Sequence, residues 1–83
     1  MKKYLVEVKL PAADLSYDMF IPDSMQIGTL TQLVASAFTK LSNGTYQASV
    51  QSILCRQETG KEYDPNLRVR DTEIRNGTKL FLF

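Results

Sequence analysis

The first two segments of the chain alternate strictly between apolar and polar positions. In residues 2–10 an apolar residue recurs at every second position, which is typical of a strand with one buried face. Residues 15–21 resume the pattern after a break at Pro11-Ala12-Ala13-Asp14, so the two segments predict a β-hairpin with a short loop. The inward positions are Tyr4, Val6, Val8 and Leu10, then Tyr17, Met19 and Ile21, whereas Ser16, Asp18 and Phe20 lie opposite.

The hydrophobic period changes after Pro22-Asp23-Ser24. Proline cannot donate to a sheet ladder, so it closes the second strand. Beyond it, apolar residues recur at spacings of three and four, which places them on one stripe of a helix of about fifteen residues. Asn43-Gly44 ends this helix, and Gly44 suits a left-handed C′ position. The stripe contains Ile27, Leu30, Val34, Ala37, Phe38 and Leu41.

The second half of the chain predicts three more strands. Residues 49–57 form one around Val50, Ile53, Leu54 and Cys55, residues 61–63 form a short one, and residues 78–83 form the last. Helix and sheet must bury their apolar faces on each other. The order ββαβββ therefore predicts an α+β fold in which a mixed sheet of four to five strands packs on one helix. The first and last strands pair in parallel at the centre, which is the β-grasp arrangement.

Composition limits the class of protein. Eighty-three residues form one domain, residues 1–83, and the hydrophobic share of 43% with 23% charged residues is typical of a globular protein. The net charge of +1 argues against a nucleic-acid partner. No apolar segment approaches the roughly 20 residues needed to cross a bilayer, so we expect no direct membrane insertion. A single cysteine fits a reducing, cytoplasmic setting.

The residues that most often carry catalysis are missing or isolated. The chain has no histidine, which removes the commonest general base and metal ligand. Cys55 lies in an alternating strand, where a small buried cysteine is usually inert. Asp14, Asp18 and Asp23 lack the tight spacing of a calcium loop, and the glycines are scattered through turns. We therefore expect no enzymatic activity, no metal and no cofactor.

The C-terminal third of the chain resembles that of ubiquitin. Both have a Gly-Lys turn, here Gly60-Lys61, followed by a spaced series of anchors and a final alternating strand. The anchors here are Val69, Asp71 and Ile74. The resemblance implies that Leu80 and Leu82 point inward, and that Phe81 and Phe83 point outward.

Almost the whole chain is also similar to the YukD/EsaB family, small bacterial ubiquitin-like proteins encoded with type VII (WXG100, Ess) secretion systems of Gram-positive bacteria. The similarity lies in Tyr17-Asp18-Met19-Phe20-Ile21-Pro22, in Ile27 at the helix entry, and in the turn Ile74-Arg75-Asn76-Gly77. It implies a cytoplasmic, non-catalytic adaptor that binds a protein partner. Candidate partners are a membrane component of the secretion system or its FtsK/SpoIIIE-like ATPase.

The last residues distinguish this chain from ubiquitin itself. Conjugation of ubiquitin needs a flexible tail that ends in Gly-Gly, whereas Phe83 is expected to belong to a strand. We therefore expect that the chain is not conjugated. Two alternatives remain open: it is the N-terminal ubiquitin-like domain of a longer membrane component, or it is a sulfur carrier or protein modifier whose tail is missing.

Large apolar side chains are predicted on the face of the sheet that the helix does not cover. A sheet face left in water is normally polar, and a contiguous apolar area usually marks an interface. The alternatives are that a loop covers these residues or that the strand register differs. We predict one patch that docks a protein partner, or mediates self-association, and that contains Leu5, Leu54, Phe81 and Phe83.

A basic patch is a weaker alternative. The fold would bring several cations near one edge, where a solvated rim that discourages edge pairing explains them better than a binding site. These residues are Lys2, Lys3, Arg56, Arg68, Arg70, Arg75 and Lys79.

Overall fold

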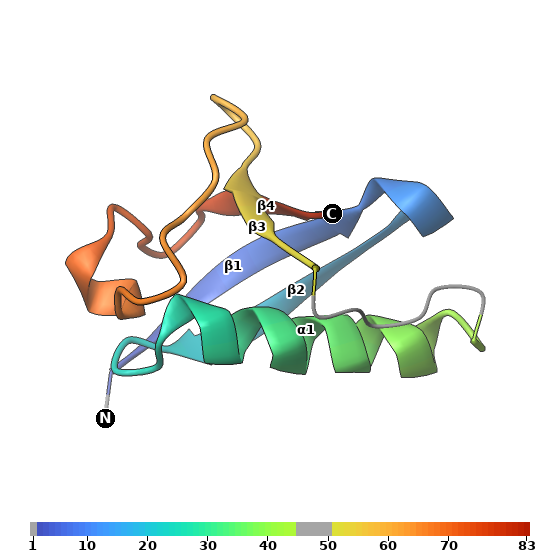
Figure 1. The fold of residues 1–83 in the computed structure, drawn as a ribbon, viewed down its shortest axis with the longest axis horizontal. Coiled ribbons are helices and arrows are strands. Elements are labelled where there is room, and N and C mark those ends of the chain that lie inside the picture. The colour runs from blue at the N-terminus through green and yellow to red at the C-terminus, as the bar shows by residue number, and fades with distance from the viewer. Residues whose placement is uncertain (1, 45–50) are drawn as a thin grey trace.

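The computed structural model describes residues 2–44 and 51–83, in which a single helix lies across one face of a four-stranded sheet (Figure 1). Short 3-10 turns occupy Pro11–Ala13 and Val69–Asp71. The strands and the helix are β1 (Lys3–Leu10), β2 (Leu15–Pro22), α1 (Ile27–Leu41), β3 (Leu54–Arg56) and β4 (Lys79–Leu82).

The strand order β2-β1-β4-β3 puts the first and last strands side by side at the centre of the sheet. These two strands run parallel, whereas β1–β2 and β3–β4 are antiparallel. The crossover between β1 and β4 contains α1, as a parallel pair requires. The chain therefore has the ubiquitin-like β-grasp fold that the sequence predicts.

The core confirms most of the predicted inward positions of the hairpin and the helix, but Tyr17 is 37% exposed and Leu41 is 46% exposed. Val6, Val8 and Leu10 on β1 are at most 1% exposed, and Phe38 on α1 is fully buried. The helix spans the predicted residues and is followed by Asn43 and Gly44, both with positive φ. The core also contains Tyr4, Ile21, Ile27, Leu30, Val34, Ala35, Leu54, Tyr63, Val69, Ile74, Leu80 and Leu82.

The third and fourth predicted strands are shorter than expected. Within the described residues, regular pairing in the third covers only Leu54–Arg56, and residues 49–50 lie outside the described part. In place of a strand at 61–63 there is one bridge between Cys55 and Glu62. The N–H of Tyr63 donates to the carbonyl of Leu54 at 3.1 Å. The chain then turns away, because Pro65 has no N–H to extend the ladder.

Gly28 allows the loop before the second 3-10 turn to lie against the start of α1. Its N–H donates to the carbonyl of Pro65 at 2.9 Å, and a Cβ at this position would lie 3.3 Å from the Cβ of Pro65. We expect Gly28→Val to lower the free energy of unfolding by about 1–3 kcal/mol, the usual cost of overpacking. Urea denaturation measures this loss, and unchanged stability would show that the loop is free to move away.

No helix in residues 2–44 or 51–83 has the length and apolar character needed to span a bilayer.

Candidate protein-interaction face

The face of the sheet opposite α1, here called the open face, carries large apolar side chains. Strand alternation places Leu5, Phe20, Phe81 and Phe83 there. Leu5 is 39% exposed, Phe20 69% and Phe83 56%, whereas Phe81 is half-buried. The rings of Phe81 and Phe83 lie 5.4 Å apart between centroids. These exposures confirm the predicted placement of Leu5 and Phe83, and that of Phe81 in part.

The placement of Leu54 on this face is wrong. Leu54 is 1% exposed and belongs to the core. It pairs with Leu82 across β3 and β4, and directly opposed residues point to the same side of a sheet. Leu54 therefore points into the core with Leu82. Cys55 pairs with Phe81 and so points to the opposite side of the sheet, where it is only 4% exposed.

The open face contains Phe20, which the sequence prediction left out. Phe20 pairs with Leu5 in the hairpin, so the two side chains share one side of the sheet. The sequence alone indicates this position, because the alternation of residues 15–21 puts Phe20 on the side opposite to Met19 and Ile21. We call Leu5 and Phe20 the hairpin cluster, and Phe81 and Phe83 the terminal cluster.

The register of the two central strands separates these clusters. In the parallel pair, Glu7 lies beside Lys79 and Lys9 lies beside Phe81. Leu5 is thus four residues from the level of Phe81, or about 13 Å along the strand. The single contiguous patch predicted from the sequence is therefore two apolar clusters on one face.

A row of charged side chains crosses the face between the two clusters. Asp18 pairs with Glu7, and Glu7 pairs with Lys79. The Ser16 hydroxyl donates to Glu7 Oε1 at 2.8 Å, so the row includes an ordered acceptor. A partner of this face must present two apolar contacts with a polar strip between them.

The turn before β4 borders the hairpin cluster. Leu5 N–H donates to Asn76 Oδ1 at 2.8 Å, and Gly77 N–H donates to the Leu5 carbonyl at 2.8 Å. Gly77 has φ of 88°, which favours glycine at this close approach. These hydrogen bonds hold the turn beside Leu5. A shallow depression of about 470 Å³ lies there, between the hairpin cluster and Lys79.

A polar network connects Arg56 of β3 to the long loop that precedes β4 and holds that loop in place. The Tyr63 hydroxyl donates to Glu73 Oε1 at 2.7 Å, and Arg56 donates to the same oxygen at 2.9 Å. Burial opposes the ionisation of Glu73, but the hydrogen bonds from Tyr63, its own backbone and Arg56 outweigh it, so the pKa of Glu73 lies below its ordinary value. Burial, and then the bond to Glu73, raise the pKa of Tyr63. No local sequence pattern indicates this network, because its members are far apart in the chain.

The lowered pKa of Glu73 predicts a loss of stability in acid. A carboxyl whose pKa is lower in the folded state stabilises the fold above its unfolded pKa, and the contribution disappears as the pH falls through the folded pKa. We expect this loss below pH 4.5. At pH 7, Glu73→Gln should cost about 1 kcal/mol, because hydrogen bonds to charged groups are strong but this side chain is 46% exposed.

The test compares thermal unfolding of the parent protein and of Glu73→Gln between pH 7 and pH 3. The difference between the two midpoints should shrink as the pH falls below 4.5. A difference between the midpoints that stays constant over this range would show that ionisation of Glu73 does not contribute to the stability of the fold.

Three of the seven cations of the predicted basic patch make ion-pair or ring contacts within the chain. Arg56 forms ion pairs with Glu58 at 3.0 Å and Glu73 at 2.9 Å. Lys2 and Arg75 both lie over the ring of Tyr4, at 5.4 and 5.5 Å. These contacts favour the interpretation of the cations as a structural and solvated rim.

Cys55 is 4% exposed, as predicted. Burial and the neighbouring charge of Glu62 raise the pKa of its thiol, which disfavours the nucleophilic thiolate. Within the described residues, no three His, Cys, Asp or Glu side chains are grouped to hold a metal ion.

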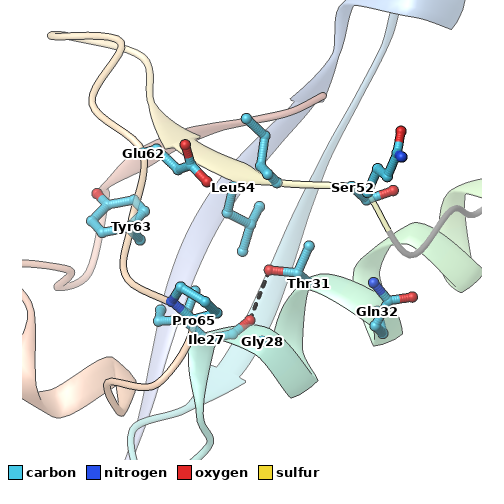
Figure 2. Close-up of a pocket in the computed structure, with 11 residues that line it drawn as sticks. Ile27, Gly28, Thr31, Gln32, Ser52, Leu54, Glu62, Tyr63 and Pro65 are labelled. Atoms are coloured by element: carbon cyan, nitrogen blue, oxygen red, sulfur yellow. Dashed lines mark hydrogen bonds between the residues drawn. The ribbon is translucent and has the colours of Figure 1, made fainter.

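A second concavity lies between α1 and the β3 edge, with a volume of about 230 Å³ (Figure 2). Figure 2 shows Thr31 and Gln32 of α1 on one side, and Leu54, Tyr63 and Pro65 on the other. The Thr31 hydroxyl donates to the Ile27 carbonyl at 2.7 Å, within the helix itself. This polar group is thus already satisfied, and the concavity follows from the packing of the loop on Gly28.

Comparisons with known proteins identify structures with the same fold. No protein-family model matches the sequence, and no curated protein matches it. The EccD5 ubiquitin-like domain from Mycobacterium xenopi is 20% identical with a TM-score of 0.72, over 100% of this chain and 94% of that chain. The ubiquitin-like domain of the Mycobacterium tuberculosis type VII secretion protein EccD1 is 12% identical with a TM-score of 0.74, over 99% and 98%.

One match is part of a much longer protein. A chain of the MycP5-free ESX-5 inner membrane complex is 13% identical with a TM-score of 0.74, and this chain spans 21% of its length. A chain of a toluene 4-monooxygenase complex has a higher TM-score, 0.81, at 5% identity. Similarity at these identities therefore establishes only the fold, and the function has to be inferred from the side chains on the surface of this chain. The chain has the ubiquitin-like β-grasp fold, and its structural neighbours include ubiquitin-like domains of mycobacterial type VII secretion proteins.

Proposed function

We propose that this protein is a non-catalytic, cytoplasmic adaptor of a type VII secretion system that docks a protein partner through its open face. The observation that carries the proposal is the exposure of Leu5, Phe20 and Phe83 on a sheet face that the helix does not cover. Three large apolar side chains in water on one face are unfavourable for an isolated domain unless they serve an interface.

The open face also specifies the kind of partner. Apolar side chains of the partner that pack against the hairpin and terminal clusters would supply most of the affinity, since burying a large side chain contributes about 1.5–3 kcal/mol. The charged row would set the orientation of the bound partner. The partner must place hydrogen-bond donors opposite Glu7 and Asp18 and an acceptor opposite Lys79. A flat, partly apolar protein surface meets both conditions.

The secretion context is supported by the ubiquitin-like domains of EccD5 and EccD1 among the structural neighbours, together with the similarity to the YukD/EsaB family. Candidate partners are a membrane component or the ATPase of such a system. A second candidate function keeps the same fold: the chain is the N-terminal ubiquitin-like domain of a longer membrane component. The match to one fifth of a chain in an inner membrane complex favours this candidate.

The test measures binding of the purified protein to the cytoplasmic segments of the membrane component and of the ATPase encoded beside its gene. We expect micromolar affinity for one of them by calorimetry, about −8 kcal/mol. Absence of binding to both segments would contradict the adaptor proposal. The reading frame of the gene separates the two candidates, because a downstream membrane-spanning region would make the chain a domain of the membrane component itself.

A further inference from the structure

We propose that Asn76 is a modification site, which the pairing of its turn with β1 keeps unreactive in the folded chain. Asparagine is chemically labile, most of all before glycine, because a residue without a side chain leaves its backbone nitrogen open to attack the neighbouring amide. Asn76-Gly77 has this sequence and lies in the exposed turn before β4. The reaction needs no partner protein, so it is independent of the proposed docking.

The reaction is deamidation, and water is its only co-reactant. The Gly77 backbone nitrogen loses its proton and attacks Asn76 Cγ, so that a new N–C bond forms and the Cγ–Nδ2 bond breaks to release ammonia. Water then opens the cyclic imide at either of its carbonyl carbons. One opening gives aspartate, and the other gives isoaspartate, in which the main chain runs through Cβ.

The backbone of Leu5 holds both reacting groups. Leu5 N–H donates to Asn76 Oδ1 at 2.8 Å, and Gly77 N–H donates to the Leu5 carbonyl at 2.8 Å. The first bond fixes the amide group that would be attacked, and the second holds the proton that the attacking nitrogen must lose. Deamidation of Asn76 therefore requires that the turn first separate from β1.

The turn is closed by further hydrogen bonds of its own. Arg75 N–H donates to Thr78 Oγ1 at 2.9 Å, and Thr78 N–H donates to the Arg75 carbonyl at 3.1 Å. Glu7 N–H donates to the Thr78 carbonyl at 3.1 Å, where β1 and β4 begin to pair. Exposed turns open more readily than core strands, so loss of the Thr78 hydroxyl should raise the population of the open turn.

The two products differ in whether the turn can close again. Aspartate keeps a side-chain oxygen at the place of Asn76 Oδ1, so Leu5 N–H still has an acceptor. Isoaspartate adds its Cβ atom to the main chain, which moves Gly77 N–H out of register with the Leu5 carbonyl. Isoaspartate therefore leaves the turn detached from β1.

The chain contains an internal control for this reaction. Asn43-Gly44-Thr45 repeats the sequence of Asn76-Gly77-Thr78, so we expect similar rates at the two asparagines once the chain is unfolded. Asn43 follows α1, and Gly44 N–H donates to the Thr39 carbonyl of that helix at 3.1 Å. A change confined to the turn before β4 should thus leave the rate at Asn43 unaltered.

The first test follows both asparagines by mass spectrometry during incubation above pH 8, in buffer and in concentrated guanidinium chloride. Cleavage after glutamate separates them, because Glu58 and Glu73 lie between them in the chain. We expect Asn76 to react at least about tenfold more slowly in buffer, because opening of the turn limits the reaction. Equal rates at Asn76 in the two solvents would overturn the proposal.

Matched variants at Thr78 then test whether the turn controls the rate. Thr78→Val removes the hydroxyl that accepts from Arg75 N–H, whereas Thr78→Ser keeps it, and both leave Asn76-Gly77 intact. In buffer Thr78→Val should speed the reaction of Asn76 about threefold or more, the effect of one lost hydrogen bond, with the rate at Asn43 unchanged. Thr78→Ser should react like the parent at both sites.

An unchanged rate at Asn76 in Thr78→Val would overturn the proposal. So would equal acceleration at Asn43, because the reaction would then proceed through unfolding of the whole chain. Chemical synthesis with isoaspartate in place of Asn76 tests the consequence for the turn. Its thermal midpoint should lie below that of Asn76→Asp, and equal midpoints would contradict the detachment of the turn from β1.

Discussion

Replacing Leu54 with alanine should destabilise the protein by about 2–5 kcal/mol, the usual cost of truncating a buried leucine. Leu54 is 1% exposed and faces the core beside Leu82. A folded unit of this size loses much of its stability through such a change, because the net free energy of unfolding is usually about 5–15 kcal/mol. Leu54→Asp should therefore abolish folding, since it would bury an unpaired charge as well.

Chemical denaturation of Leu54→Ala measures this loss. The matched control is Phe83→Asp, at a position that is 56% exposed, and we expect it to unfold within about 1 kcal/mol of the parent. Equal, small effects of the two changes would place Leu54 on the surface and contradict the register of β3 and β4.

The second large effect is expected on partner binding. Leu5→Thr combined with Phe83→Asp removes one apolar contact from each cluster while threonine keeps the strand preference of β1. We expect affinity for the proposed partner to fall at least about a hundredfold, from two contributions of about 1.4 kcal/mol each. Calorimetric titration measures the change against Leu67→Asp, a control that alters an exposed apolar residue outside the sheet.

Each single variant shows whether both clusters take part. The clusters are about 13 Å apart along the strand, so their effects should be nearly additive. A loss confined to Phe83→Asp would reduce the interface to the terminal cluster. Binding of the double variant at the affinity of the parent would exclude the open face as the docking surface.

The sequence was sufficient to predict the elements with strong local signals. The spacing of Ile27, Leu30 and Val34 fixes the helix, and the alternation of residues 2–10 fixes the buried face of β1. Both patterns need only neighbouring residues. The parallel pairing of the first and last strands followed from the crossover rule and is confirmed.

Features that depend on pairing between distant segments were harder to predict. Ile53-Leu54-Cys55 is a continuous apolar run, so alternation does not say which residue points inward; the pairing with Leu82 decides it. The offset between β1 and β4, which separates Leu5 from Phe81, is likewise set by tertiary packing. Phe20 is different, because the local hairpin pattern already placed it on the open side.

The central claim is that the open face docks a protein partner, and amide chemical shifts test it most directly. The ¹⁵N-labelled protein is titrated with the partner segment that binds it in the calorimetric test, and the chemical-shift changes are mapped onto the structure. We predict that the largest changes fall on Leu5, Glu7, Phe81 and Phe83, with little change along the outer surface of α1. Changes concentrated on α1, with Leu5 and Phe83 unaffected, would contradict the proposed interface.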